Sequence, residues 1–179
     1  MPIELITGPA RCGKSRWAEH RAAASGLTVH YLATGPHLPD DPAWQERLRL
    51  HRLRRPSDWL CQEVGIGLPA ALKDLTCRDI ALVDSLGTWV SAGLDLDRQG
   101  WLEHCAWLQA SLLSTACRVL LVSEQVGWGV VPPTAIGGLF RDRLGSLEDQ
   151  LTPHCQHLWL VVAGRAFDLL PISEPVPPC

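Results

Sequence analysis

The sequence predicts an α/β fold in which helices cover both faces of a mostly parallel β-sheet. Short apolar runs without strict polar alternation, as expected of strands buried on both faces, occur at residues 3–7, 29–33, 80–83, 119–123 and 158–163. Helix-forming segments lie at residues 14–24, about 42–55, 101–116 and 134–152. Because these strands and helices alternate, we expect right-handed crossovers and a doubly wound layer structure.

A glycine-bearing loop joins the first strand to the first helix. Its residues match the pattern G-x-x-x-x-G-K-[ST] without a gap and are Gly8, Pro9, Ala10, Arg11, Cys12, Gly13, Lys14 and Ser15. In such a loop, backbone N–H groups converge on anionic oxygens at the positive end of a helix. Gly13 allows close approach, Lys14 reaches the terminal phosphates as a catalytic residue, and Ser15 ligates Mg²⁺. The motif predicts a P-loop NTPase-like fold that binds a nucleoside triphosphate.

An acidic residue follows the third apolar run. Asp84 stands directly after residues 80–83, at the carboxyl end of a predicted central strand. Open α/β sheets bind ligands at that end of their strands. We therefore expect Asp84 to be a second ligand for the Mg²⁺ that accompanies the phosphates. The alternative is a helix cap, because Asp and Ser directly before Leu86 are both good N-cap residues.

The helix predicted at residues 42–55 is strongly basic. Asp41 and the proline after it form a helix-start signal, and Pro56 ends the helix. Arg47, His51 and Arg55 recur at spacing i, i+4, i+8, which places an imidazole between two guanidinium groups on one face. A neutral imidazole can attack phosphorus, and the arginines can pair with phosphate oxygens. The alternative is a solvated basic face.

Length and composition suit one compact domain. The chain has 179 residues, 46% of them hydrophobic, and we assign residues 1–170 to this domain. Residues 167–170 are expected to add an edge strand, and residues 171–179 hold four prolines and form an irregular tail. No apolar stretch approaches the roughly 20 residues that span a bilayer.

Charge and cysteine usage narrow the partners and the compartment. The formal net charge of −3 argues against a nucleic-acid partner. The seven cysteines include no C-x-x-C pair, and no secretory leader is apparent. We expect a cytoplasmic protein with reduced, mostly buried cysteines.

Three segments taken together resemble one enzyme family. They are residues 8–15 (GPARCGKS), 47–59 (RLRLHRLRRPSDW) and 126–132 (VGWGVVP), and the likeness runs from about residue 3 to 168. The sequence is similar to the bifunctional adenosylcobinamide kinase/adenosylcobinamide-phosphate guanylyltransferases. The resemblance implies phosphorylation of adenosylcobinamide on its aminopropanol hydroxyl, with ATP or GTP as donor. It also implies transfer of GMP from GTP to adenosylcobinamide phosphate, which gives adenosylcobinamide-GDP and pyrophosphate.

The same resemblance implies roles for single residues. His51 matches the histidine that carries the guanylyl group in the family, so a covalent guanylyl-histidine is expected. The positions that match nucleotide contacts in the family are Thr34, Gly35, Pro36, Arg52, Leu53, Arg54, Arg55, Glu63 and Asp84. Family members assemble as trimers or similar rings, which implies a homo-oligomer such as a trimer.

The chain departs from the family pattern at three places. Pro9 stands where the family usually has glycine, and Leu50 precedes His51 where some members have another histidine. Residues 123–125 read Ser-Glu-Gln in place of a common Ser/Thr-Asn-Glu. We expect this last change to weaken the kinase step.

Other functions stay open at this point. A monofunctional P-loop kinase of another small metabolite would use the basic helix as a lid and form no covalent nucleotidyl enzyme. A GTP-dependent switch is disfavoured because the chain lacks an N-K-x-D motif. A nucleic-acid-binding module would depend on a single short basic segment.

Overall fold

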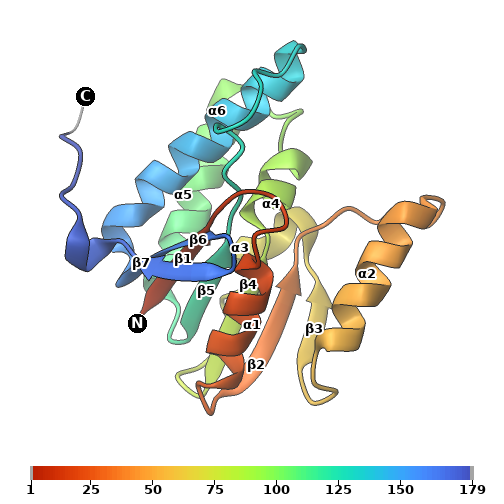
Figure 1. The fold of residues 1–179 in the computed structure, drawn as a ribbon, viewed down its shortest axis with the longest axis vertical. Helices are drawn as coiled ribbons and strands as arrows, with labels where there is room; N and C mark the ends of the chain where they lie inside the picture. Colours follow the sequence, from red (N-terminus) through yellow and green to blue (C-terminus); the bar gives the residue numbers. More distant parts are fainter. Residues whose placement is uncertain (1, 178–179) are drawn as a thin grey trace.

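One sheet organises the molecule. The computed structural model describes residues 2–177, apart from the side chains of Arg47, His51 and Arg54. The sheet has seven strands in the order β3-β2-β4-β5-β1-β6-β7 (Figure 1). They are β1 (Ile3–Thr7), β2 (Thr28–Ala33), β3 (Leu60–Glu63), β4 (Asp79–Asp84), β5 (Arg118–Val122), β6 (His157–Val162) and β7 (Arg165–Asp168). Only the β6–β7 pair is antiparallel among the described strands, so the expectation of a mostly parallel sheet is confirmed.

Helices alternate with the strands along the chain. They are α1 (Lys14–Ala23), α2 (Pro42–Arg54), α3 (Leu68–Ala71), α4 (Leu86–Ala92), α5 (Arg98–Ser114) and α6 (Ala135–Leu151). Short 3₁₀ turns add Gly65–Gly67, Thr152–His154 and Leu170–Ile172. Figure 1 shows α2 beside β3, at the opposite edge of the sheet from β7.

The core is divided by the sheet into two layers. Successive side chains of a strand point to opposite faces, so Leu5 and Ile6 of β1 belong to different clusters. One cluster packs α3, α4, α5 and α6 against the sheet, and Trp89 lies fully buried within it. The other cluster packs α1 through Ala18 and Ala22. Helices therefore cover both faces, as predicted.

The observed elements differ from the sequence prediction mainly at their ends. The helix expected at 101–116 begins earlier, at residue 98, because Asp97 caps it by accepting a hydrogen bond from the N–H of Gly100. The edge strand expected at 167–170 lies at Arg165–Asp168, where it pairs with β6. The strand β3 was missed, because its four residues are all exposed and carry no apolar pattern.

The state of the cysteines can be compared with the expectation of reduced, mostly buried thiols. The described cysteines are free thiols. Cys12, Cys105 and Cys117 are buried, but Cys61 and Cys77 are exposed, so the expectation of mostly buried thiols holds only in part. Cys179 lies outside the described residues. Within the described chain, no helix is long and apolar enough to cross a membrane.

Candidate active site

The segment between β1 and α1 has the geometry of a phosphate-binding loop. β1 ends at Thr7 and α1 begins at Lys14, which confirms the predicted order of strand, loop and helix. Gly13 has a φ of 107°, a left-handed value that favours glycine. A Cβ on Gly8 would lie 2.1 Å from the carbonyl oxygen of Val161, so the loop leaves β1 tightly against β6. These glycines let the loop backbone wrap around the start of α1, where anions bind.

Lys14 folds back over this loop. Its side chain is 8% exposed, and its Nζ donates a hydrogen bond to the carbonyl oxygen of Pro9 at 3.2 Å. That position suits an ammonium group that will meet the oxygens of bound phosphates. Proline lacks only the backbone N–H and keeps its carbonyl, so the departure from glycine at Pro9 is compatible with this contact.

Asp84 ends the central strand β4, which lies between β2 and β5. Its Oδ2 accepts a hydrogen bond of 2.6 Å from the hydroxyl of Tyr31. The next helix is capped by Ser85, whose hydroxyl accepts from the N–H of Thr88 in a capping box. The alternative in which Asp84 caps α4 is therefore wrong, since its neighbour does so.

Ser15 and Asp84 are the two oxygen donors that the sequence predicts for Mg²⁺. Ser15 lies in the first turn of α1, and Asp84 lies at the carboxyl edge of the sheet. Among the described residues, no group of three or more His, Cys, Asp or Glu side chains could hold a metal ion. Mg²⁺ in phosphate sites usually takes one or two protein ligands and completes its shell with phosphate oxygens and water. The residues present fit that mode.

Residues 34–36 continue from β2 along the same edge of the sheet. The hydroxyl of Thr34 donates to the carbonyl oxygen of Ser85 at 2.5 Å and accepts from its N–H at 2.8 Å. Thr34 is 1% exposed, so its side chain fastens β2 to the start of α4. A Cβ on Gly35 would lie 2.8 Å from the ring of Trp44, and Pro36 accepts a hydrogen bond from the Trp44 indole. This packing holds α2 close to the loop after β2.

The carboxyl end of α2 is anchored to the strands below it. The guanidinium of Arg52 lies 3.0 Å from Glu63 on β3, and Nδ1 of His37 lies 3.9 Å from the same carboxylate. The guanidinium of Arg55 stacks on the ring of Tyr31. Leu53 is 68% exposed. Arg52 thus contacts β3 and Arg55 contacts β2, while the nucleotide contacts that the resemblance implies for Arg52, Arg55 and Glu63 stay predictions.

The backbone of α2 gives the position of the predicted nucleophile. His51 lies on α2, between the turn that Trp44 anchors and the end that Arg55 anchors. The side chains of His51, Arg47 and Arg54 are outside the described residues. The predicted guanylyl-carrying role of His51 therefore stays a prediction.

Two half-buried carboxyl groups near Lys14, those of Glu124 and Glu148, were not assigned a role by sequence reasoning. Glu124 follows β5, and its Oε2 accepts a hydrogen bond of 3.0 Å from the N–H of Gly87. Burial raises the pKa of the Glu124 carboxyl and the charge of Asp84 adds to this, whereas the Lys14 charge opposes it. Burial likewise raises the pKa of the Glu148 carboxyl on α6, again against the charge of Lys14.

A signal for Glu148 was present in the sequence. It stands four residues after Leu144 and three before Leu151, both of which are buried. Positions at these spacings share one face of a helix, so a glutamate there falls beside the apolar stripe. A charged residue on a buried face needs partners, which makes it a candidate functional residue.

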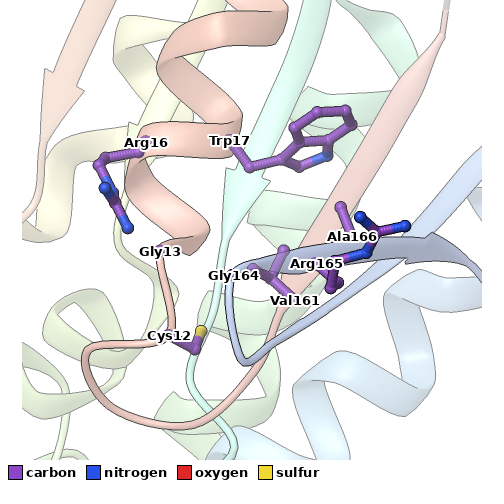
Figure 2. Close-up of a pocket in the computed structure, with 8 residues that line it drawn as sticks. All are labelled: Cys12, Gly13, Arg16, Trp17, Val161, Gly164, Arg165 and Ala166. Atoms are coloured by element: carbon purple, nitrogen blue, oxygen red, sulfur yellow. The ribbon is translucent and has the colours of Figure 1, made fainter.

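A cavity of about 390 Å³ lies beside the phosphate loop on its β6–β7 side. It is lined by Cys12, Gly13, Arg16, Trp17, Val161, Gly164, Arg165 and Ala166. Figure 2 shows Trp17 projecting from the first turn of α1 toward the hairpin that carries Gly164, Arg165 and Ala166. This volume is in the range of small-molecule sites.

A smaller cavity of about 270 Å³ lies between the segment after β5 and α6. Its lining residues are Glu124, Gln125, Val126, Gly127, Arg141, Asp142, Gly145 and Glu148. The wall includes both half-buried carboxyl groups, and the charge of Lys14 acts on both. The hydrogen bond between Glu148 and Thr7 connects this pocket to the start of the phosphate loop.

The fold and the loop define the class of this protein: it is a P-loop nucleotide-binding α/β protein. Solved structures with the same fold include the RadB recombinase, with a TM-score of 0.51 and 15% identity over 89% of this chain and 73% of that one. An ATPase from the type III secretion system of pathogenic bacteria has a TM-score of 0.52 and 10% identity over 93% of this chain and 56% of that one. At these identities the likeness concerns the fold alone.

Sequence comparison identifies the family. The model of the family described as "Cobinamide kinase / cobinamide phosphate guanyltransferase" matches residues 4–169. The bifunctional adenosylcobalamin biosynthesis protein CobP of Pseudomonas aeruginosa is 35% identical, over 93% of this chain and 96% of its own length. The protein CobU of Escherichia coli, of the same description, is 33% identical over 89% of this chain and 95% of its own length. The chain belongs to this family and is a transferase.

Proposed function

We propose that the protein catalyses two successive transfers in cobalamin biosynthesis. It phosphorylates adenosylcobinamide, and it then transfers GMP from GTP to adenosylcobinamide phosphate to give adenosylcobinamide-GDP. The observation that carries the proposal is the phosphate loop between β1 and α1, with Lys14 folded over it, inside a family match that covers residues 4–169. A loop of this kind serves both a kinase donor and a GTP donor, because each presents a triphosphate.

The nucleotide is proposed to bind with Mg²⁺, held by Ser15 and Asp84. Bound Mg²⁺ would neutralise phosphate charge during transfer. The protein's own contribution is to fix the two oxygen donors: Ser15 by the first turn of α1, and Asp84 by its place in β4 and its hydrogen bond to Tyr31. Ser15→Ala and Asp84→Asn should each raise the Mg²⁺ concentration needed for half-maximal rate.

We further propose that His51 carries the guanylyl group as a phosphoramidate. Its imidazole nitrogen would form a bond to the α-phosphorus of GTP while the bond to pyrophosphate breaks. Support comes from the placement of α2, whose carboxyl end is fastened beside β2 and β3 by Arg55 and Arg52. Guanidinium groups there can pair with phosphate oxygens.

The cavity beside Trp17 is the proposed place for the base of the kinase donor. It opens at Gly13, so a nucleotide with phosphates in the loop can lay its base there. The guanidinium of Arg165 and the indole of Trp17 offer flat surfaces for stacking. ATP and GTP are both candidate donors, because stacking does not distinguish two purines.

A homo-oligomer, for example a trimer, is proposed for the assembled enzyme in the cytoplasm. None of the side chains that the structure describes on α2 is buried, and Leu50 and Leu53 are 47% and 68% exposed. A second copy that covers this helix would bury them. Leu53→Glu should then lower the oligomer mass in sedimentation without unfolding the subunit.

The experiment that tests the proposal incubates the purified protein with α-labelled GTP and Mg²⁺. We expect acid-labile, alkali-stable label on the protein, as a histidine phosphoramidate requires. The label should vanish in His51→Ala and persist in His20→Ala and His37→Ala. Chase with adenosylcobinamide phosphate should move the label to adenosylcobinamide-GDP.

The second candidate is the monofunctional kinase, which the P-loop and the cavity beside it also support. It predicts ATP-dependent phosphorylation of another small metabolite, with no labelled protein. Wild-type protein that phosphorylates but never acquires guanylyl label would favour it over the bifunctional enzyme.

A further inference from the structure

Three side chains from different elements meet next to the start of the phosphate loop. The Thr7 hydroxyl, at the end of β1, donates to Oε1 of Glu148 at 2.8 Å. The amide of Gln125, after β5, donates to Oε2 of Glu148 at 3.0 Å and to the Thr7 hydroxyl at 3.2 Å. Each carboxylate oxygen of Glu148 therefore has a fixed donor, and the group is held in one place.

This triad places a carboxylate beside a position where the family commonly has one. The family commonly has Ser/Thr-Asn-Glu at residues 123–125, whereas this chain has Ser-Glu-Gln. Gln125 is neutral, but its amide donates a hydrogen bond to the carboxylate of Glu148, which lies on α6. Glutamine and glutamate have nearly the same shape, so exchanging these two side chains would fill the same space and keep one negative charge. The site of this chain therefore keeps one carboxylate, on Glu148.

We propose that Glu148 supplies the carboxylate of the kinase site and accepts the proton of the acceptor hydroxyl during phosphoryl transfer. This inference rests on the proposed kinase function. If Glu148 supplies the carboxylate, the glutamine at residue 125 need not weaken the kinase step. The earlier expectation of a weaker kinase considered no other carboxylate at this site.

The pocket in front of Glu148 fits a short hydroxyl-bearing arm. Its volume of about 270 Å³ lies below the usual range of sites that enclose a whole ligand, roughly 300–1,000 Å³. A large acceptor would therefore stay outside and insert only its alcohol arm. The pocket also holds Arg141 and Asp142 on its α6 side, and Glu124 and Gln125 on its β5 side.

Glu124 is the competing carboxylate, and its contacts point elsewhere. Its Oε2 is bonded to the N–H of Gly87, and a Cβ on Gly87 would lie 2.2 Å from that oxygen. Glu124 thus packs tightly on the first turn of α4. Glu148, by contrast, accepts a hydrogen bond from Thr7, the residue directly before the phosphate loop.

The step balances without any further reactant. The acceptor oxygen forms a bond to the γ-phosphorus while the bond from that phosphorus to the β–γ bridging oxygen breaks. The electron pair of the broken bond leaves with the nucleoside diphosphate. The hydroxyl proton passes to Glu148, which returns it to water after the product departs. Burial keeps the pKa of this carboxyl above its ordinary value, which suits a proton acceptor.

The test exchanges the two residues. Glu148→Gln, Gln125→Glu and the double variant are assayed separately for phosphorylation of adenosylcobinamide by ATP and for guanylyl transfer to adenosylcobinamide phosphate. We expect Glu148→Gln to lower the kinase kcat by about 100-fold or more, the usual effect of losing a general base, with little change in KM for ATP. Guanylyl transfer should stay within about threefold. The double variant should recover kinase activity to within about tenfold of wild type, because it restores one carboxylate to the pair.

A matched control is available on α5. Gln99 donates to Glu103 at 2.8 Å in an exposed pair of the same two residue types. Glu103→Gln should leave both activities unchanged. Thermal unfolding of every variant separates loss of folding from loss of chemistry, and the double variant serves if Glu148→Gln does not fold.

Several results would overturn the inference. They are full kinase activity in Glu148→Gln, equal loss of both activities in that variant, or a double variant no better than the single one. Loss of kinase activity in Glu124→Gln but not in Glu148→Gln would assign the role to Glu124 instead. Wild-type protein that phosphorylates no adenosylcobinamide would instead refute the proposed function itself.

Discussion

The guanidinium carbon of Arg55 lies 3.3 Å from the centroid of the Tyr31 ring. Tyr31 is buried in β2, and its hydroxyl donates to Asp84 at the end of β4. Burial raises the pKa of Tyr31 further above its ordinary value and the charge of Asp84 adds to this, so the hydroxyl keeps its proton at neutral pH. One chain of contacts therefore connects the end of the basic helix to the proposed metal ligand.

Because the contact between Arg55 and Tyr31 holds the carboxyl end of α2, we predict that Arg55→Ala impairs guanylyl transfer more than phosphorylation. Loss of the cation–π contact should cost about 1 kcal/mol and free the carboxyl end of α2, where the nucleotide's α-phosphate is proposed to meet His51. We expect a loss of about tenfold or more in guanylylation rate, equivalent to about 1.4 kcal/mol. The two rates can be measured with labelled GTP and with ATP.

Arg49→Ala is the matched control for Arg55. Arg49 lies on the same helix but pairs only with Glu46, one turn away on α2, among its described contacts. Its removal should change neither rate. Equal loss of both activities in Arg55→Ala would contradict a role restricted to α2.

A second prediction concerns the left-handed backbone of the phosphate loop. At Gly13, φ is 107°, so Gly13→Ala forces an alanine into a conformation that costs about 1–2 kcal/mol. The loop should relax by turning its N–H groups away from the phosphates. We expect ATP affinity to fall by at least about tenfold, measured by calorimetry.

Gly138→Ala supplies the comparison. Gly138 lies inside α6, and a Cβ there would meet nothing within 4 Å. This change should stabilise the protein by about 0.5–1 kcal/mol through helix propensity and leave ATP binding intact. An unaltered ATP affinity in Gly13→Ala would rule out a phosphate-binding role for the loop backbone.

The fold was readable from sequence because its central strands are uninterrupted apolar runs. Residues 80–83 and 119–122 form buried strands where expected. The strand at Leu60–Glu63 could not be predicted from the sequence, because an exposed edge strand has neither a continuous apolar run nor alternation of apolar and polar residues. Its presence depends on pairing with β2, which is a tertiary contact.

The site was predictable where a local motif specifies it and not where it is assembled at a distance. The phosphate loop is contiguous, so its spacing identifies it. Glu148 becomes a site residue only because α6 places it 2.8 Å from a threonine 141 positions earlier in the chain. No local pattern encodes that distance, although its place on the buried stripe of α6 marks it as unusual.

A third prediction uses a buried charge in β1. Glu4 is 1% exposed, and it accepts hydrogen bonds from Arg21, Arg118 and the Trp159 indole. Burial alone would raise the pKa of this carboxyl, but the hydrogen bonds and the charge of Arg21 outweigh it and hold the pKa below its ordinary value. Glu4 therefore stabilises the fold fully above the unfolded-state pKa of about 4.3, and this contribution is lost as pH falls through the lower folded-state pKa.

Glu4→Gln tests this reasoning through the pH dependence of unfolding. At pH 7 the variant should lose about 2 kcal/mol, because two guanidinium groups are left without their carboxylate. Below the folded-state pKa the difference from wild type should shrink toward zero. Denaturant titrations across this range give the curve. The control Glu46→Gln, which removes an exposed carboxylate of α2, should leave the denaturation midpoint unchanged. A difference in unfolding free energy between Glu4→Gln and wild type that does not change with pH would argue against the ionic explanation.

The last prediction concerns the cavity that Trp17 and Arg165 line. If the base of the kinase donor lies there, Arg165→Ala removes a stacking surface worth about 0.5–2 kcal/mol and should raise the KM for ATP by about 2-fold to 30-fold. ADP binding should also change the Trp17 fluorescence, and Trp17→Phe should abolish that change.

The matched control variant for Arg165→Ala is Arg78→Ala, at an exposed arginine just before the amino end of β4 and away from the loop. GTP-dependent labelling of the protein should survive Arg165→Ala, because the residues that resemble the guanylyl-donor site lie on the β2–β3 side of the sheet. If KM for ATP stays unchanged while labelling falls, the cavity would belong to the GTP that donates the guanylyl group, and the two nucleotides would then share one base site.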